Sequence, residues 1–211
     1  MNCDRIARWY QLLEHIAFGR ALEQRRREYM DEVADAGRVL ILGDGDGRFT
    51  AEFLRRSAAI QIDSVDLSAR MLDIAQERIR ACELSPVRVR FHQGDVRTTD
   101  LPVKYDLIVS HFFLDCFTRD ELPALVARIA QAACPQARWL ISEFHVPSVG
   151  MWRWVAAALI NMMYLFFRVV TGLQTNRLPD YAASLTDQGF RRIQHRSAWH
   201  GFLVSEVWER A

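Results

Sequence analysis

The sequence predicts an α/β fold with a mostly parallel sheet and helices on both of its faces. Three observations support this prediction. Short apolar runs alternate with amphipathic segments over residues 38–145, which is the pattern of parallel strands joined by helices. The runs are almost continuously apolar, as in strands that are buried on both faces. Over residues 189–209, two strand-like runs flank His200-Gly201, which indicates a C-terminal hairpin and an antiparallel final strand.

Length and composition limit the possible functions. The chain has 211 residues, of which half are hydrophobic, and its formal net charge is +1. This size predicts one domain, residues 1–211, with a large core. The small net charge gives no reason to expect a nucleic-acid partner. The four cysteines form no Cys-x-x-Cys pair, so we expect no metal site and a reducing, cytoplasmic environment.

The N-terminal segment has the apolar spacing of an amphipathic helix over residues 4–30. Trp9 and Tyr10 lie on its apolar face, where they could pack on the sheet or contribute to a ligand site. The run Arg25-Arg26-Arg27 stands beside Glu23 and Glu28, which favours a solvated helix face over a basic binding site.

The most informative feature is the run Val39–Leu42, which ends in Gly43, Gly45 and Gly47. A buried strand that ends in glycines lets the backbone turn sharply beneath a ligand. The spacing excludes a dinucleotide fingerprint, because no glycine stands at its third position. Asp44 and Asp46 would repel a pyrophosphate, whereas they suit a cationic ligand.

Acidic residues follow two later strands. Asp66 ends the run Ile60–Val65, where its carboxylate can accept both hydroxyls of a ribose. Ser68 is a good N-cap for the helix that follows. A third strand, Val87–Phe91, leads to Asp95, which can accept a hydrogen bond from an adenine amino group. A fourth, Tyr105–Ser110, ends at His111.

In these motifs the chain resembles the class I S-adenosylmethionine-dependent methyltransferases, which have a Rossmann-like seven-stranded sheet. The resemblance covers residues 38–145 and rests on Leu42–Gly47, Asp66–Leu72, Gly94–Val96 and Tyr105–Val109. It implies S-adenosyl-L-methionine as cofactor and residues 1–35 as a helical lid. The cofactor-binding residues that it implies are Tyr10, Gly43, Asp44, Gly45, Gly47, Asp66, Leu67, Met71, Asp95, Val96, Ser110 and His111.

The chain departs from this family at one position. Members usually carry an acid two residues before the first loop glycine, where this chain has Ile41. In the family, that acid helps to hold the methionine end of the cofactor. Asp44 or Asp46 in the loop could take over this contact.

Candidate catalytic residues lie at the carboxyl ends of strands, where open α/β sheets bind ligands. His111 titrates in a range that suits a general base, and Asp115, four residues on, is placed to orient it or to cap a local turn. Glu143 and His145 end the fifth strand and complete the candidate set. A base is needed only if the acceptor is a poor nucleophile when protonated.

Residues 151–175 form an apolar helical insertion. On a helical wheel, Arg153, Asn161 and Arg168 fall within one narrow sector, and apolar side chains cover the rest. The uninterrupted apolar stretch is shorter than the roughly 20 residues that a bilayer requires. The helix could therefore lie in the core, line an apolar substrate pocket, form a dimer interface, or lie in a membrane interface.

The sequence therefore predicts methyl transfer to a small, largely apolar acceptor such as a quinone, a phenol or a lipid-like compound, on oxygen or carbon. Two alternatives stay open at this stage: N-methylation of a phospholipid head group at the membrane surface, and a non-catalytic cofactor-binding relative. The expected partner is a small lipophilic substrate, with peripheral membrane contact through residues 151–173 as a further option. The sequence leaves the oligomeric state open.

Overall fold

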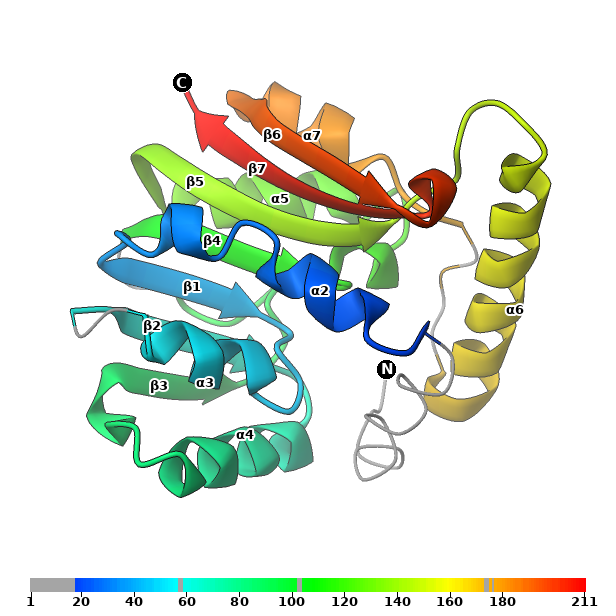
Figure 1. Cartoon of the computed structure of the whole chain (residues 1–211). Helices are drawn as coiled ribbons and strands as arrows, with labels where there is room; N and C mark the ends of the chain where they lie inside the picture. The colour runs from blue at the N-terminus through cyan, green and yellow to red at the C-terminus, as the bar shows by residue number, and fades with distance from the viewer. Residues whose placement is uncertain (1–17, 57–58, 102–103, 173–174, 176) are drawn as a thin grey trace.

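The computed structural model describes residues 18–56, 59–101, 104–172, 175 and 177–211. Its centre is one seven-stranded sheet with the order β3-β2-β1-β4-β5-β7-β6 (Figure 1). The strands are β1 (Arg38–Leu42), β2 (Gln61–Asp66), β3 (Val89–Gln93), β4 (Tyr105–His111), β5 (Ala133–Phe144), β6 (Phe190–Ala198) and β7 (Leu203–Arg210). The first five strands are parallel, and β7 runs antiparallel to both β5 and β6. The predicted fold class is confirmed.

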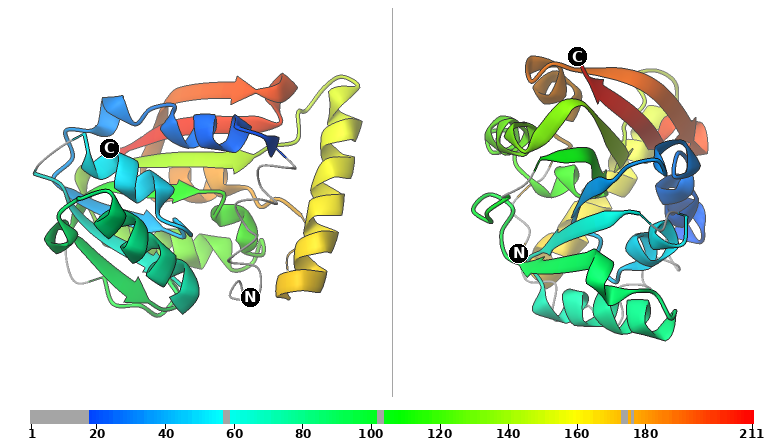
Figure 2. Two further views of the ribbon diagram at one scale, coloured as in Figure 1. Left: turned by 60° about the horizontal axis from the view of Figure 1, so that its bottom comes forward. Right: turned by 90° about the vertical axis from the view of Figure 1, so that its left-hand side faces the viewer.

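Helices cover both faces of this sheet, as Figures 1 and 2 show. The helices are α2 (Ala21–Arg27), α3 (Arg48–Leu54), α4 (Ala69–Ala81), α5 (Leu122–Gln131), α6 (Trp152–Thr171) and α7 (Tyr181–Asp187). Short 3-10 turns are η1 (Asp31–Val33), η2 (Pro86–Arg88), η3 (Leu114–Cys116) and η4 (Trp199–Gly201).

The alternation of side chains along β1 shows how the two faces are filled. Val39 and Ile41 pack with Phe49 and Phe53 of α3 in one buried cluster. Leu40 and Leu42 pack on the opposite face, in a cluster that contains the apolar stripe of α5. Because successive side chains point to opposite faces and both faces are covered, the strand is apolar throughout.

Several element boundaries differ from the sequence prediction, and two of these differences have a clear outcome in the structure. The third strand starts at Val89 rather than Val87, because Pro86 opens the η2 turn and fixes its first residue in a helical conformation. The N-terminal helix ends at Arg27 rather than at residue 30, and the chain continues through turns into η1. Residues 1–17, with about half of the expected lid (residues 1–35) and Tyr10, lie outside the described part of the chain.

The described part of the N-terminal segment forms a layer of the fold. The carbonyl oxygen of Arg25 accepts hydrogen bonds from the hydroxyls of Ser142 on β5 and Ser205 on β7. Arg25 itself is largely buried and pairs with Glu28 at 2.6 Å. The expectation of a solvated face for the arginine run is therefore wrong for Arg25, because α2 packs flat against these two strands.

Candidate functional site

The glycine loop between β1 and α3 has the geometry that a ligand-binding turn requires. Gly43, Gly45 and Gly47 all have positive φ angles, of 64°, 64° and 74°. A Cβ on Gly43 would lie 2.5 Å from the Phe113 ring, and one on Gly47 would lie 2.6 Å from Ala75 of α4. A Cβ on Gly45 would meet none of the described atoms within 4 Å. Gly45 therefore presents bare backbone to open space at the carboxyl edge of the sheet.

Asp66, at the end of β2, holds this loop through hydrogen bonds to its backbone. One of its carboxylate oxygens accepts from the backbone N–H of Gly45 at 3.3 Å, and the other from that of Ser68 at 2.8 Å. The predicted N-cap is confirmed, since the Ser68 hydroxyl accepts from the N–H of Met71 at 3.2 Å. A carboxylate oxygen has two lone pairs, so Asp66 can hold the loop and still accept from a ligand. Leu67 beside it is exposed.

The two loop acids differ in their availability. Asp46 is buried and paired with Arg48 at 2.9 Å and with Arg78 of α4 at 3.0 Å, so it fixes the loop to α4. Asp44 uses one oxygen to accept from the amide and hydroxyl of Thr50. Burial raises the pKa of Asp44 to about 6, against the opposing effect of the Thr50 hydrogen bonds. Of the two acids, Asp44 is the one that keeps an oxygen for a ligand.

Two other predicted cofactor residues have their side chains engaged within the protein. Both oxygens of Asp95 accept from the Arg97 guanidinium, which holds the Asp95 pKa below its usual value. An adenine amino group would have to share or replace these contacts, so that assignment stays a prediction. The buried Ser110 hydroxyl accepts from the indole of Trp139 at 2.9 Å, which gives this side chain a structural role. Val96 is buried in the core.

His111 is the last residue of β4, and it is buried. Neither ring nitrogen has a hydrogen-bond partner among the described residues, and the ring contacts Phe49 edge-on at 4.7 Å. Burial, with the nearby positive charge of Arg26, holds its pKa well below the ordinary value. The imidazole is therefore neutral near pH 7 and has a lone pair that can accept a proton.

A second orphaned polar group is the carboxyl of Glu143 on β5. One oxygen accepts from the backbone N–H groups of Phe113 and Leu114, at 3.0 and 2.8 Å. The other oxygen is buried and has no partner among the described residues. Burial, reinforced by Asp115, raises the Glu143 pKa well above its usual range. Burial therefore favours the protonated form of Glu143, in which the carboxyl can donate one hydrogen bond.

Asp115 and Tyr164 extend this acidic cluster towards α6. Burial raises the pKa of Asp115 to about 6. The hydroxyl of Tyr164 donates to the backbone carbonyl of Asp115 at 3.2 Å. Burial and the two acids raise the Tyr164 pKa well above its ordinary value, so the phenol stays protonated.

The structure separates His111 from the acids that the sequence placed beside it. His111 pairs in register with Ser142, whose hydroxyl bonds to α2. Because side chains alternate along a strand, Glu143 points to the opposite face. Asp115 interacts with Glu143 there and does not bond to His111. Of the two options for Asp115, that it orients His111 is therefore wrong; Phe112, with a positive φ of 53°, stands between the two residues.

His145 does not join either group. It is exposed, and its Nδ1 lies 3.0 Å from the carbonyl oxygen of Gly201 in the hairpin. The sequence analysis missed Arg26 and Tyr164 as residues of this region. Arg26 lies over the Phe112 ring at 5.3 Å. Neither had a local signal, since one stands in a run of arginines and the other in an apolar helix.

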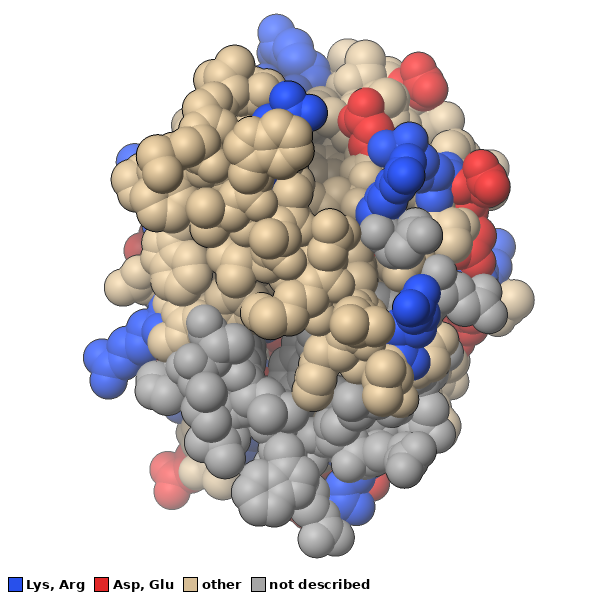
Figure 3. All heavy atoms as spheres, turned by 90° about the vertical axis from the view of Figure 1, so that its right-hand side faces the viewer, with Lys and Arg blue, Asp and Glu red and all other residues tan. Residues whose placement is uncertain are grey.

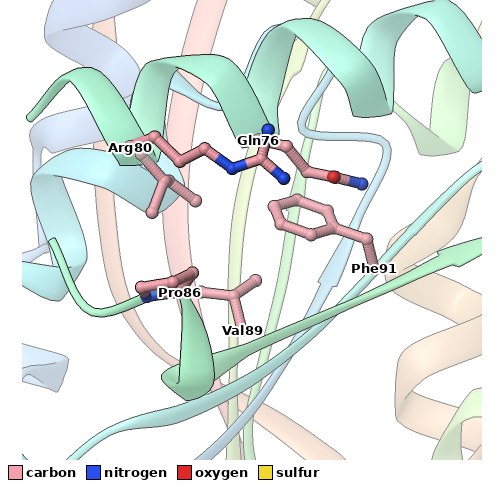
Figure 4. Close-up of a pocket in the computed structure, with 6 residues that line it drawn as sticks. Gln76, Arg80, Pro86, Val89 and Phe91 are labelled. Carbon is pink, nitrogen blue, oxygen red and sulfur yellow. The ribbon is translucent and has the colours of Figure 1, made fainter.

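A further cavity lies away from the glycine loop. It measures about 210 Å³ and is lined by residues of α4, η2 and β3, as Figure 4 shows: Gln76, Ile79, Arg80, Pro86, Val89 and Phe91. Pro86 and Val89 stand where β3 begins, so this cavity lies towards the amino ends of the strands. It is therefore distinct from the glycine loop. No group of three potential metal ligands gathers among the described residues.

Comparisons with known proteins agree with this geometry. Residues 39–136 match the sequence model of a family described as a methyltransferase domain. A malonyl-[acyl-carrier protein] O-methyltransferase of Halalkalibacterium halodurans is 32% identical over 58% of this chain and 44% of its own length. A demethylmenaquinone methyltransferase of Deinococcus radiodurans is 28% identical over 69% of this chain and 60% of its own. The chain thus spans less than two thirds of either relative.

Solved structures share the whole fold at low sequence identity. The N-methyltransferase NodS from Bradyrhizobium japonicum, solved with S-adenosyl-L-homocysteine, has a TM-score of 0.67 and 11% identity, over 90% of this chain and 88% of its own. An O-methyltransferase family 2 protein from Planctomyces limnophilus has a TM-score of 0.71 and 18% identity, over 97% and 62%. The family match therefore shows a methyltransferase domain over residues 39–136, and the sheet order shows the fold of the class I S-adenosylmethionine-dependent methyltransferases.

Proposed function

We propose that this protein transfers the methyl group of S-adenosylmethionine to a small, largely apolar acceptor, on oxygen or carbon. The observation that carries the proposal is the open glycine loop, in which Gly45 presents bare backbone above the carboxylate of Asp66. The methyltransferase-domain match covers this loop and the strands that follow it. By their names, one relative acts on demethylmenaquinone, and one structural neighbour was solved with apigenin. Both compounds support an aromatic, largely apolar acceptor.

In this proposal, two acidic residues bind the cofactor and one histidine accepts a proton. Bound S-adenosylmethionine supplies a methyl group on a sulfonium. Asp66 accepts hydrogen bonds from the ribose hydroxyls. The second oxygen of Asp44 accepts a hydrogen bond from the ammonium group at the methionine end of the cofactor. Asp44 thus takes the role of the family's acid at the position where this chain has Ile41. The neutral imidazole of His111 accepts the proton that a hydroxyl or carbon acceptor loses.

Calorimetric titration with S-adenosylmethionine and with S-adenosylhomocysteine tests the cofactor assignment. We expect micromolar binding of both by the wild-type protein. Asp66→Asn should weaken it by on the order of tenfold to a hundredfold, because a charge-assisted hydrogen bond to the ribose is lost. The matched control is Asp73→Asn on the exposed side of α4. Unchanged affinity in Asp66→Asn would refute the assignment, and no binding by the wild type would remove the enzymatic proposal.

Once an acceptor is found, His111→Gln tests the base. We expect kcat to fall by about a hundredfold or more, with the affinity for S-adenosylhomocysteine retained and the pH dependence of the rate altered. His195→Gln on the exposed strand β6 is the control. Full activity and an unshifted pH profile in His111→Gln would rule out a general base at this position. Cofactor binding without transfer to any acceptor would indicate a non-catalytic relative.

A further inference from the structure

Helix α6 stands across the carboxyl edge of the sheet, apart from the other helices (Figure 2). Its inner face is fixed to the protein by Ala156, Ile160 and Tyr164, which are buried with Phe144 and Leu203. The hydrogen bond from Tyr164 to Asp115 anchors the same face. These inner residues recur every fourth position, so the opposite side of the helix points away from the molecule.

The outer side of α6 is apolar and exposed. Trp154, Met162 and Val169 are 71%, 63% and 76% exposed. At 100° per residue, all positions within an arc of about 140° opposite the inner face carry apolar side chains. These positions, which we call the outer face, are Trp154, Val155, Ala158, Leu159, Met162, Leu165, Phe166 and Val169. The sequence-based option of a core helix is therefore wrong for this face.

Neighbouring segments enlarge the apolar surface. Val149 and Met151 are exposed just before the helix, and Trp199 is exposed in the hairpin turn. The Trp152 ring stacks on His200 of that turn at 4.1 Å, with an interplanar angle of 8°. Figure 3 looks onto this side of the molecule and shows a continuous uncharged field, with both basic and acidic residues along its right-hand border. Monomeric soluble proteins rarely expose a contiguous apolar patch of this kind without a binding role.

The distribution of charged residues around α6 indicates which kind of partner covers the outer face. The sequence has no Asp or Glu from Phe144 to Pro179, whereas Arg153, Arg168 and Arg177 fall within this stretch. Arg153 lies against the Trp154 ring at 5.2 Å. Arg168 lines a pocket of about 90 Å³ beside the outer face, together with Asn161 and Thr175. An apolar strip with tryptophans and Arg168 near its margins, and with the exposed Arg153 folded against Trp154 at the start of the helix, suits the boundary between acyl chains and anionic head groups.

A second copy of the chain fits this surface less well. Pairing two outer faces would bring the arginines of both copies together, and residues 144–179 provide no acid to compensate them. A transmembrane arrangement is not supported either, since none of the described helices is long and apolar enough to cross a bilayer. The remaining arrangement has α6 lying in the plane of a membrane surface.

We propose that the outer face of α6 docks this protein on an anionic lipid bilayer, with Arg153 and Arg168 at the head groups. The inference goes beyond the proposed methyl transfer and does not depend on it, because it concerns a surface outside the cofactor site. Docking would also place the carboxyl edge of the sheet beside the bilayer, since α6 stands at that edge. A lipophilic acceptor could then enter the site without crossing bulk water.

Vesicle co-sedimentation of the full chain tests the proposal. We expect the protein to bind vesicles of phosphatidylcholine mixed with phosphatidylglycerol, to bind pure phosphatidylcholine more weakly, and to lose the difference at high salt. The double substitution Met162→Ser and Val169→Ser should lower partitioning by about tenfold or more. Ile193→Ser, at an exposed apolar position of β6, is the matched control and should bind as the wild type does.

The charge variants separate the two contributions. Arg153→Gln with Arg168→Gln should lower binding to anionic vesicles by on the order of tenfold and leave binding to neutral vesicles unchanged. Failure of the folded wild type to bind either vesicle would overturn the proposal, and so would wild-type binding by the outer-face variant. An α6-dependent dimer in sedimentation velocity, without vesicle binding, would assign the face to a second copy. Circular dichroism on the same samples reports folding, and calorimetry with S-adenosylhomocysteine reports the cofactor site.

Discussion

At the scale of single residues, the candidate site is defined by polar atoms that the fold buries without partners. His111 and Glu143 each place such an atom at the carboxyl edge of the sheet, among the described residues. An unsatisfied buried polar atom costs about 1–3 kcal/mol. Both unsatisfied groups lie near the ends of neighbouring strands, β4 and β5. Such groups are expected where a bound ligand completes their hydrogen bonds.

Asp115 provides a residue-scale prediction about pH. Its pKa is raised from 3.8 to about 6 by burial, so the folded chain holds this proton more tightly than the unfolded chain. The protonated Asp115 carboxyl therefore contributes most to the stability of the folded chain below about pH 4, and this contribution is lost as the pH rises through about 6. Asp115→Asn removes the charge that the fold must bury above that range.

We expect Asp115→Asn to raise the free energy of unfolding at pH 8 by about 3 kcal/mol, from about 1.4 kcal/mol for each pKa unit, and to change it little at pH 4. Urea denaturation at the two pH values measures this difference. The exposed Asp73→Asn serves as control. An equal effect of Asp115→Asn at both pH values would contradict the assigned cause.

At the scale of elements, helix α4 shows how local sequence and the site depend on each other. Ser68 caps the helix through Met71, while Asp46 of the loop bonds to Arg78 two turns further on. The helix therefore holds the glycine loop through its side chains, and Ala75 leaves no room for a side chain at Gly47.

The cap of α4 can be tested on its own. Ser68→Ala should lower the free energy of unfolding by about 1 kcal/mol, because the N–H of Met71 loses its acceptor. Ser85 also stands at an N-cap, that of η2, but its side chain makes no capping bond. Ser85→Ala should therefore be nearly neutral in the same thermal or urea denaturation. Equal losses in both variants would show that the Ser68 bond does not stabilise the helix.

At the scale of the whole molecule, the sheet divides the candidate catalytic residues between its two faces. His111 lies with α2 and α3, whereas Glu143 and Asp115 lie on the opposite side towards Tyr164 of α6. The neutral imidazole of His111 and the buried carboxyl of Glu143 thus approach the carboxyl edge from two sides. A cofactor and an acceptor at this edge would lie between the two groups.

This separation predicts additive effects on stability. The changes in unfolding free energy at pH 8 for His111→Gln and Asp115→Asn should sum, within about 0.5 kcal/mol, to that of the double variant. Residues joined by a hydrogen bond would instead show coupling of about 0.5–3 kcal/mol. A double-mutant cycle by urea denaturation decides between the two arrangements. Coupling in the upper part of that range would restore the His111–Asp115 pair that the sequence suggested.

The sequence by itself determined the order of the strands along the chain, most of the helices and the glycine loop, but it did not predict α7. The apolar run before Gly43, the acid at Asp66 and the cap at Ser68 are properties of neighbouring residues, so their patterns could be read locally. The tertiary structure alone decided which side chains meet. Strand register sends His111 and Glu143 to opposite faces, and long-range packing leaves the outer face of α6 exposed. Local periodicity shows that a residue lies on a face, but only pairing between distant segments decides what that face contacts.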